Sequence, residues 1–175
     1  MPVPTNYAGP RANEKKEKPT YSQTPATNQS HSEATVEHIL NHKGHDIFSV
    51  QPDASLGSAV DELRNRRIGA VLVLDETGEL AGILSERDIV RKLSDSSEDT
   101  LSQPVETLMT SNVQTASPQE TLTSILKRMT EGRFRHMPVM KSGSLHGMIT
   151  IGDVVNHRLR ELEYETVKLK QIIVG

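Results

Sequence analysis

The sequence contains one segment twice, in the same order and about 65 residues apart. Four apolar residues recur at an offset of 66: Leu56, Ala59, Val60 and Leu63 return as Leu122, Ile125, Leu126 and Met129. Two glycines, a hydroxyl residue and an aspartate recur at an offset of 65: Gly78, Gly82, Ser85 and Asp88 return as Gly143, Gly147, Thr150 and Asp153. Because the landmarks keep their order, the duplication predicts a single domain with internal pseudo-symmetry.

Composition excludes several classes of protein. A chain of 175 residues with 34% hydrophobic content can bury one ordinary core. The net charge of −3 gives no field that would attract nucleic acid or an anionic membrane. There is no cysteine, no apolar run of about 18 residues, and no apolar signal core near Met1. We therefore expect a cytoplasmic protein that binds neither nucleic acid nor membrane.

The chain divides into five segments. Residues 1–34 lack Leu, Ile and Phe and hold five of the nine prolines, so they are expected to form a disordered tail. A transit peptide is the alternative, against which Glu14 and Glu17 argue. The first copy of the repeat then occupies residues 35–95, a polar linker residues 96–104, the second copy residues 105–160, and a C-terminal helix residues 161–175.

Each copy is expected to form a β-α-β-β-α unit. In the second copy Ser117 can cap a helix, with Pro118 at the first helical position and Glu120 completing a capping box. Apolar runs at residues 70–74 and 137–140 predict buried strands, and glycine turns lead to short strands at 80–84 and 145–149. The small sheet of one unit cannot be covered alone, so the two units should pack together as a mixed α/β (α+β) fold.

Each copy ends in a hydroxyl residue followed three positions later by an aspartate, Ser85 with Asp88 and Thr150 with Asp153. At a helix start this spacing places a hydroxyl and a carboxylate beside free backbone N–H groups. A carboxylate can accept hydrogen bonds from the two hydroxyls of a ribose, and the donors suit a phosphate. The same spacing is also that of a capping box, in which the carboxylate only satisfies backbone donors. The residues leave both interpretations open.

The repeated segments resemble cystathionine-β-synthase (CBS) motifs. The resemblance is carried by residues 68–75 (IGAVLVLD) with 82–90 (GILSERDIV), and by residues 133–139 (RFRHMPV) with 147–155 (GMITIGDVV). The resemblance covers residues 36–160. This part of the chain is similar to short proteins that consist of one CBS pair, called a Bateman module. The resemblance implies binding of an adenosine ligand such as AMP, ATP, NAD(H) or S-adenosylmethionine in clefts between the motifs.

The resemblance and the residue chemistry together name candidate contacts for such a ligand. Arginine suits phosphate oxygens, so the phosphate contacts are expected to be Arg87 and Arg135, followed by Arg67 and Arg133. His136 is a further candidate contact of the nucleotide. A solvated surface charge is the alternative for each arginine. By position, the adenine contacts implied by the family are Val50, Ile68, Ala116 and Met137, for which core packing is the alternative. The arginines differ between the copies, so the two clefts should be unequal.

Catalysis has little support in the sequence. There is no nucleophile paired with a base, no GxxxxGK phosphate loop and no carboxylate cluster beyond the repeated aspartates. His38 and His42 have the i, i+4 spacing of zinc ligands, but no acidic residue of a His-Glu-x-x-His motif lies between them. We expect instead a helix that ends at Gly44, with positive charge in its last turn. No enzyme activity, metal or required cofactor is expected.

A short heptad seam near the C-terminus indicates oligomerisation: Val155, Leu159, Leu162, Thr166, Leu169 and Ile173. Packing on its own module is the alternative, and the resemblance favours a homodimer, because CBS pairs associate into a disc of four motifs. The sequence thus predicts a regulatory module that binds AMP first, NAD(H) or ATP next and S-adenosylmethionine less well, and that signals to a protein it does not identify. A scaffold or dimerisation protein without a nucleotide is the rival hypothesis.

Overall fold

The computed structural model describes residues 33–95 and 99–174 of the chain. The predicted tail lies outside the described residues except for its last two positions, and so do residues 96–98 of the predicted linker. The composition of residues 1–34 placed Ala34 in the tail. Ala34 belongs to the folded part, because its carbonyl accepts a hydrogen bond from the Leu122 N–H at 3.0 Å.

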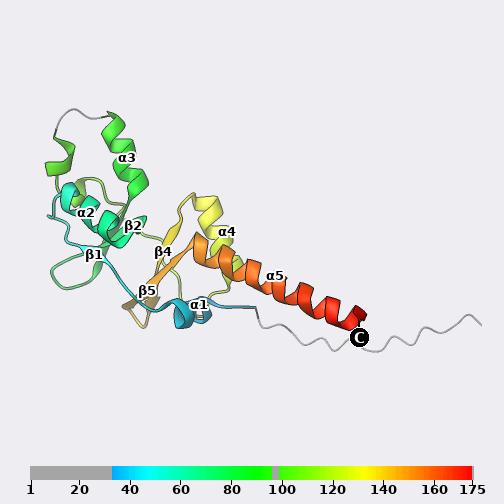
Figure 1. Ribbon diagram of the computed structural model, residues 1–175. Coiled ribbons are helices and arrows are strands. Elements are labelled where there is room, and N and C mark those ends of the chain that lie inside the picture. Colours follow the sequence, from blue (N-terminus) through cyan, green and yellow to red (C-terminus); the bar gives the residue numbers. More distant parts are fainter. Residues whose placement is uncertain (1–32, 96–98, 175) are drawn as a thin grey trace, which may run out of the picture. The chain divides into compact units, whose positions relative to one another are not determined.

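The first copy folds as the predicted β-α-β-β-α unit (Figure 1). Its elements are β1 (Ser49–Val50), α2 (Leu56–Arg66), β2 (Ala70–Leu74), β3 (Leu80–Ser85) and α3 (Glu86–Asp95). The sheet order is β1-β2-β3, with β1 parallel and β3 antiparallel to β2. The register pairs Ala70 with Ser85, so the first residue of β2 lies beside the residue that leads into α3.

The second copy repeats this unit with α4 (Leu122–Gly132), β4 (His136–Lys141), β5 (Ser144–Thr150) and α5 (Ile151–Val174). Its first strand is reduced to a single parallel bridge between Ala116 and Val139, the counterpart of the Val50 and Val73 pair in the first copy. The Ala116 N–H donates to the Pro138 carbonyl at 2.9 Å, and its carbonyl accepts from Met140 at 2.8 Å. The predicted pseudo-symmetry is therefore confirmed.

The predicted start of the second copy's helix is wrong by about one turn. The N-cap is Thr121, whose side chain accepts the Ser124 N–H at 3.3 Å. Ser117 and Glu120 instead close a turn ahead of the helix, in which the Ser117 N–H donates to the Glu120 carboxylate at 3.2 Å. The helix cannot begin earlier because Thr121 is held in an extended conformation by a bridge to Thr35.

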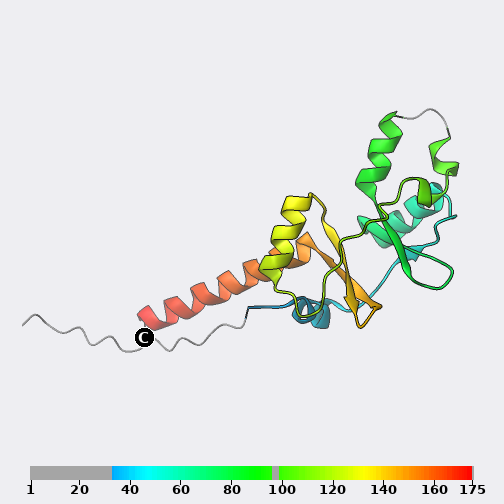
Figure 2. The same ribbon diagram turned by 180° about the vertical axis from the view of Figure 1, so that it is seen from behind.

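Each β-α-β-β-α unit is completed by the segment that precedes the other unit. Helix α1 (Val36–Lys43) precedes the first unit but lies beside β4 and β5 of the second (Figure 2), and it buries Val36, Ile39 and Leu40 in the core of that second unit. The 3-10 turns η1 (Thr100–Ser102) and η2 (Val105–Thr107) precede the second unit, and Val105 lies in the core of the first. This exchange is why neither motif has a complete core of its own.

The repeated glycines of β3 and β5 make room for these exchanged segments. A Cβ atom on Gly147 would lie 3.1 Å from the Leu40 Cδ2 atom of α1. A Cβ atom on Gly82 would lie 2.7 Å from the Met109 Sδ atom, closer than van der Waals contact allows. The absence of a side chain at these two positions lets the crossing segments approach the strands.

Helix α5 continues well beyond the second motif. It contacts α1, α4 and β5. Farther along it Leu159, Leu162 and Leu169 are 53%, 45% and 61% exposed. No helix in residues 33–95 or 99–174 is both long enough and apolar enough to cross a membrane.

Candidate nucleotide-binding site

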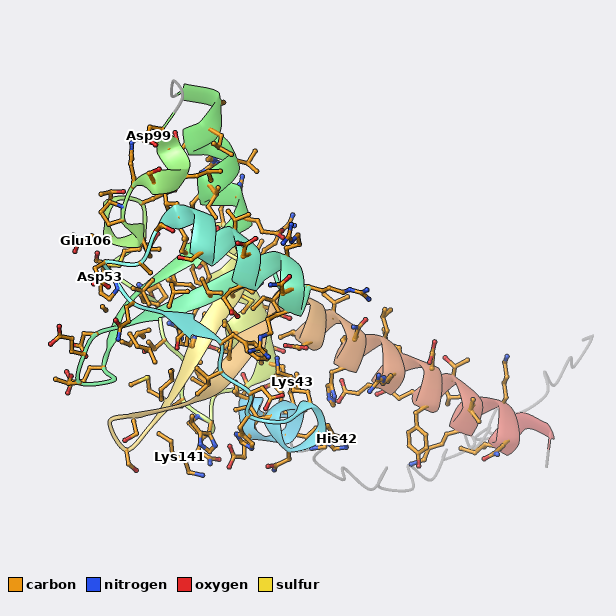
Figure 3. All side chains as sticks on the ribbon, turned by 60° about the vertical axis from the view of Figure 1, so that its left-hand side comes forward. His42, Lys43, Asp53, Asp99, Glu106 and Lys141 are labelled. Carbon is orange, nitrogen blue, oxygen red and sulfur yellow. The ribbon has the colours of Figure 1, made fainter. Side chains whose placement is uncertain are left out.

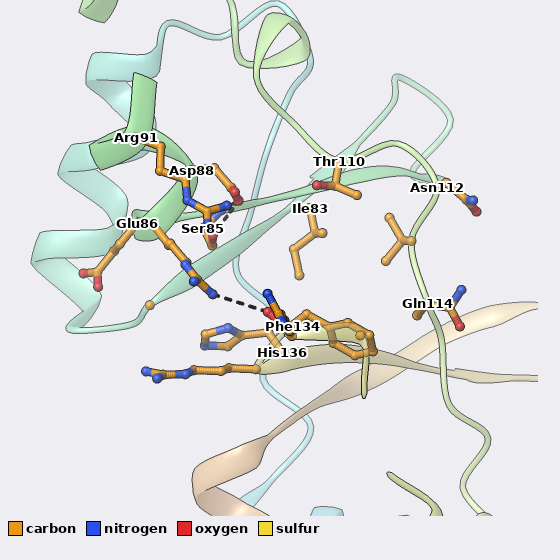
Figure 4. Close-up of a pocket in the computed structure, with 16 residues that line it drawn as sticks. Ile83, Ser85, Glu86, Asp88, Arg91, Thr110, Asn112, Gln114, Phe134 and His136 are labelled. Atoms are coloured by element: carbon orange, nitrogen blue, oxygen red, sulfur yellow. Dashed lines mark hydrogen bonds between the residues drawn. The ribbon is translucent and has the colours of Figure 1, made fainter. Parts of the chain in front are cut away.

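A cavity of about 680 Å³ lies between the two motifs (Figure 4). One wall comes from the start of α3 and includes Ser85, Glu86 and Asp88. The opposite wall comes from the residues that lead into β4, including Phe134 and His136, and residues 110–114 contribute to the lining. Its size falls within the range of about 300–1,000 Å³ that small-molecule sites occupy.

Asp88 presents a carboxylate to this cavity. It lies in the first turn of α3, where its Oδ2 atom accepts hydrogen bonds from the Ser85 N–H and the Ser85 hydroxyl. In the part of the chain that the structure describes, no Lys, Arg or His forms an ion pair with it. The other oxygen of Asp88 therefore keeps its capacity to accept hydrogen bonds from a ligand.

Four arginines line the same cavity and outnumber its two acidic residues, Glu86 and Asp88. They come from both motifs: Arg87, Arg91, Arg133 and Arg135. The Arg87 Nη1 atom donates to the backbone carbonyl of Arg133 at 3.4 Å, which joins the two walls. The excess of guanidinium groups suits an anionic ligand with phosphate oxygens.

The surroundings of His136 lower its pKa and so favour the neutral form of the ring. Burial is the main cause that lowers the pKa of His136, Lys43 and Arg135 lower it further, and Asp153 opposes them. A Cβ atom on Gly69 would lie 3.2 Å from the His136 Cε1 atom, so the glycine leaves space for the ring. A neutral imidazole can donate one hydrogen bond and accept another, which suits the polar edge of a base.

Several residues that line the cavity were not predicted from the sequence. Phe134 is half-buried in the wall of the cavity and offers an aromatic face. It occupies the same position of the repeat as Ile68, so the repeat alignment could have identified it. The repeat alignment could not identify the other lining residues Thr110, Asn112 and Gln114. They lie in a segment that reaches the cavity through long-range packing, which no local sequence pattern predicts.

The second aspartate has different neighbours. The Thr150 N–H donates to Asp153 at 2.8 Å, and the Asp153 N–H donates to the Thr150 hydroxyl at 3.2 Å, which completes a reciprocal capping box. The Lys43 ammonium also lies 2.7 Å from the Asp153 Oδ2 atom. Thr150 and Asp153 do not line the cavity at Asp88.

Five other residues named from the sequence lie outside that cavity. Met137 and Ala116 are buried in the core of the second motif. Ile68 packs against the core of the first motif, and Arg67 is an exposed left-handed cap of α2. Val50 lines an open groove with Asp53, Asp61 and Glu62. A nucleotide contact at these positions stays a prediction.

The predicted end of α1 is confirmed at Gly44, which has a φ of +94°. The His38 ring lies near two others, 4.7 Å from His42 and 5.1 Å from His157 between ring centroids. Among residues 33–95 and 99–174, no group of three or more His, Cys, Asp or Glu side chains is arranged to hold a metal ion. The histidines therefore form a packed surface cluster in this structure.

The exchanged segments, the paired motifs and the cavity between them define a tandem two-motif module. The sequence matches the CBS domain twice, over residues 36–95 and 105–160. The chain belongs to the CBS domain family, as the sequence resemblance predicted.

Solved structures and curated relatives agree with this assignment. A CBS-domain containing protein from Agrobacterium tumefaciens is 42% identical, with a TM-score of 0.70 over 73% of this chain and 96% of that one. The CBS domain pair of protein MJ0100, in complex with 5′-methylthioadenosine and S-adenosyl-L-methionine, shares the fold at a TM-score of 0.65 and 23% identity over 74% of this chain and 98% of that one.

The mitochondrial CBS domain-containing protein CBSX3 of Arabidopsis thaliana is 33% identical over 70% of this chain. The chain spans 62% of the length of CBSX3 and 65% of the length of a 17.7 kDa protein from Acidianus ambivalens. The activities and partners of the whole relatives are therefore not transferred by these matches.

Proposed function

We propose that the protein is a non-catalytic regulatory module that binds an adenine nucleotide in the cavity between its two CBS motifs. AMP is the first candidate, followed by NAD(H) and ATP. The observation that carries the proposal is that one cavity combines the Asp88 carboxylate of the first motif with arginines of both motifs.

The chemistry of a nucleotide matches this arrangement group by group. The free capacity of Asp88 suits the two ribose hydroxyls, which donate to a carboxylate. Arg133 and Arg135 suit phosphate oxygens, which accept bidentate hydrogen bonds from guanidinium. Phe134 and the neutral His136 suit a base.

The choice of AMP over S-adenosylmethionine rests on charge. The ligands named for the MJ0100 pair carry an adenosyl group and no phosphate. They support an adenosyl ligand for a CBS pair but leave four arginines of this cavity without an anion to bind. NAD(H) ranks next because its diphosphate could engage arginines of both walls.

A homodimer is part of the proposal, because apolar side chains remain exposed on equivalent helices of the two motifs. Val90 of α3 and Val155 of α5 occupy the same position of the repeat and are 64% and 42% exposed. Leu93 and Leu159 extend the apolar surface on the same two helices. Such helices can pair with those of a second copy and so convey a change of motif geometry to a partner protein.

The rival function is a scaffold without a nucleotide, and one observation favours it. Both repeated aspartates already accept hydrogen bonds at helix starts, as a purely structural cap would. The two hypotheses differ in what a nucleotide does to stability, since a ligand that binds only the folded state raises the unfolding temperature.

The experiment is a thermal unfolding series on purified protein stripped of nucleotide, with AMP, ATP, NAD⁺, NADH and S-adenosylmethionine. A ligand at about 100 times its dissociation constant adds roughly 2.7 kcal/mol, which raises the midpoint by several degrees in a domain of this size. A rise with AMP that exceeds the rise with S-adenosylmethionine supports the proposal. No rise with any of the five would contradict it and favour the scaffold.

A further inference from the structure

The two repeated aspartates are equivalent in sequence but not in electrostatics. Asp88 faces an open cavity, whereas Asp153 is ion-paired with Lys43 at 2.7 Å. We propose that Lys43 is an internal counter-ion that closes the second cleft to nucleotide, so that each chain binds one nucleotide, at Asp88. This inference rests on the nucleotide binding proposed above.

Lys43 reaches Asp153 because of the exchange of segments between the motifs. Val36, Ile39 and Leu40 anchor α1 in the core of the second motif, and Lys43 is the last residue of that helix. Gly44 then ends the helix with a φ of +94°. The anchored helix thus directs a lysine from ahead of the first β-α-β-β-α unit to the aspartate of the second unit.

The ion pair already supplies the Asp153 carboxylate with a charged hydrogen-bond donor. The Asp153 Oδ2 atom accepts hydrogen bonds from both the Lys43 ammonium and the Thr150 N–H. The Lys43 and Asp153 side chains are only 32% and 24% exposed, so water screens the pair less than it screens a surface ion pair. A neutral ribose hydroxyl would have to compete with this ammonium group for a partly buried carboxylate, which weakens ribose binding at Asp153 relative to Asp88.

The first cleft has no such counter-ion from the corresponding segment. Residues 110–114, which lead into the second motif and line the open cavity, include Thr110, Asn112 and Gln114 and carry no charged side chain. Within the described chain Asp88 makes no ion pair. One lysine therefore accounts for the difference between two otherwise repeated aspartates.

The test is the stoichiometry of AMP binding, measured by isothermal titration calorimetry on nucleotide-stripped protein. Lys43→Met removes the charge and keeps the length of the side chain, and Lys43→Arg keeps the charge. The matched control is Lys141→Met. Lys141 is the last residue of β4, near the tip of the β4–β5 hairpin (Figure 3), and it pairs with Glu37 of α1 at 3.0 Å instead of with Asp153.

We expect one equivalent of AMP per chain for the wild type, Lys43→Arg and Lys141→Met. Lys43→Met should bind a second equivalent, and adding Asp153→Asn to it should remove that second equivalent. Two equivalents on the wild type, or one on Lys43→Met, would overturn the inference while leaving the nucleotide function intact. Absence of AMP binding by every variant would instead contradict the proposed function, and this inference with it.

Discussion

Replacing Asp88 by asparagine keeps the side chain that caps α3 but removes the negative charge that we expect to bind the ribose. The asparagine oxygen can still accept the Ser85 N–H, which Asp88 accepts at 3.3 Å, so the local geometry is kept. Loss of the negative charge at the helix N-terminus costs about 0.3–1 kcal/mol of stability. For a chain of this size that corresponds to a fall of roughly 1–4 °C in the unfolding midpoint.

The same substitution should weaken nucleotide binding much more. A hydrogen bond to a charged group is stronger than a neutral one by about 1 kcal/mol, and a ribose offers two hydroxyls to the carboxylate. The expected loss is therefore about 2 kcal/mol, or about 30-fold in the dissociation constant of AMP.

Calorimetric titration of Asp88→Asn with AMP measures this loss of affinity. Thermal unfolding of the variant without AMP measures the stability lost at the N-terminus of α3. Asp153→Asn is the matched control, because Asp153 is the equivalent residue of the repeat but lies outside the cavity. Its AMP affinity should match that of the wild type. A change of less than threefold in the affinity of Asp88→Asn would refute the assignment of Asp88 to the ribose.

Three further predictions concern stability and assembly. Ile125→Ala, at a side chain with 0% exposure, should lower the free energy of unfolding by about 2–5 kcal/mol in urea titrations, and a loss below 1 kcal/mol would contradict the described core. Burial tends to raise the pKa of Glu120, but hydrogen bonds from Arg128 and the Ser117 N–H hold that pKa below 4.5. The ionised carboxylate therefore stabilises the folded state above pH 4.5, and this stabilisation is lost as pH falls through the folded-state pKa. Glu120→Gln should therefore lose less stability than the wild type between pH 7 and about pH 3, and an equal loss would refute the argument. Leu159→Glu, at a position 53% exposed, should convert a dimer to a monomer in light scattering, and an unchanged mass would exclude α5 from the interface.

The duplication made the fold predictable, because the two copies supply the same elements in the same order. The stripe from Leu56 to Leu63 and the run at residues 70–74 correspond to α2 and β2. The helix start at Ser117 was wrong because a capping box also forms in a turn, and only the bridge of Thr121 to Thr35 shows where the helix begins. Long-range pairing of this kind has no local sequence pattern.

The candidate site was predictable in part for the same reason. The structure brings predicted residues of both motifs to one cavity: Ser85, Arg87 and Asp88 of the first, and Arg133, Arg135 and His136 of the second. The ion pair of Lys43 with Asp153 joins residues 110 positions apart, so it depends on how α1 crosses to the second motif. The arginine content of the two copies predicted unequal clefts. The contact of Lys43 with Asp153, which distinguishes the two aspartates, could be identified only from the structure.

A crystal structure of the nucleotide-stripped protein with AMP added in excess would show whether Asp88 holds a nucleotide. We expect AMP between the motifs, with ribose hydroxyls about 2.5–3.0 Å from the Asp88 carboxylate and the phosphate facing arginines of the same cavity. An AMP molecule bound at Asp153 with Lys43 displaced, or a cavity that stays empty at saturating AMP, would contradict this expectation.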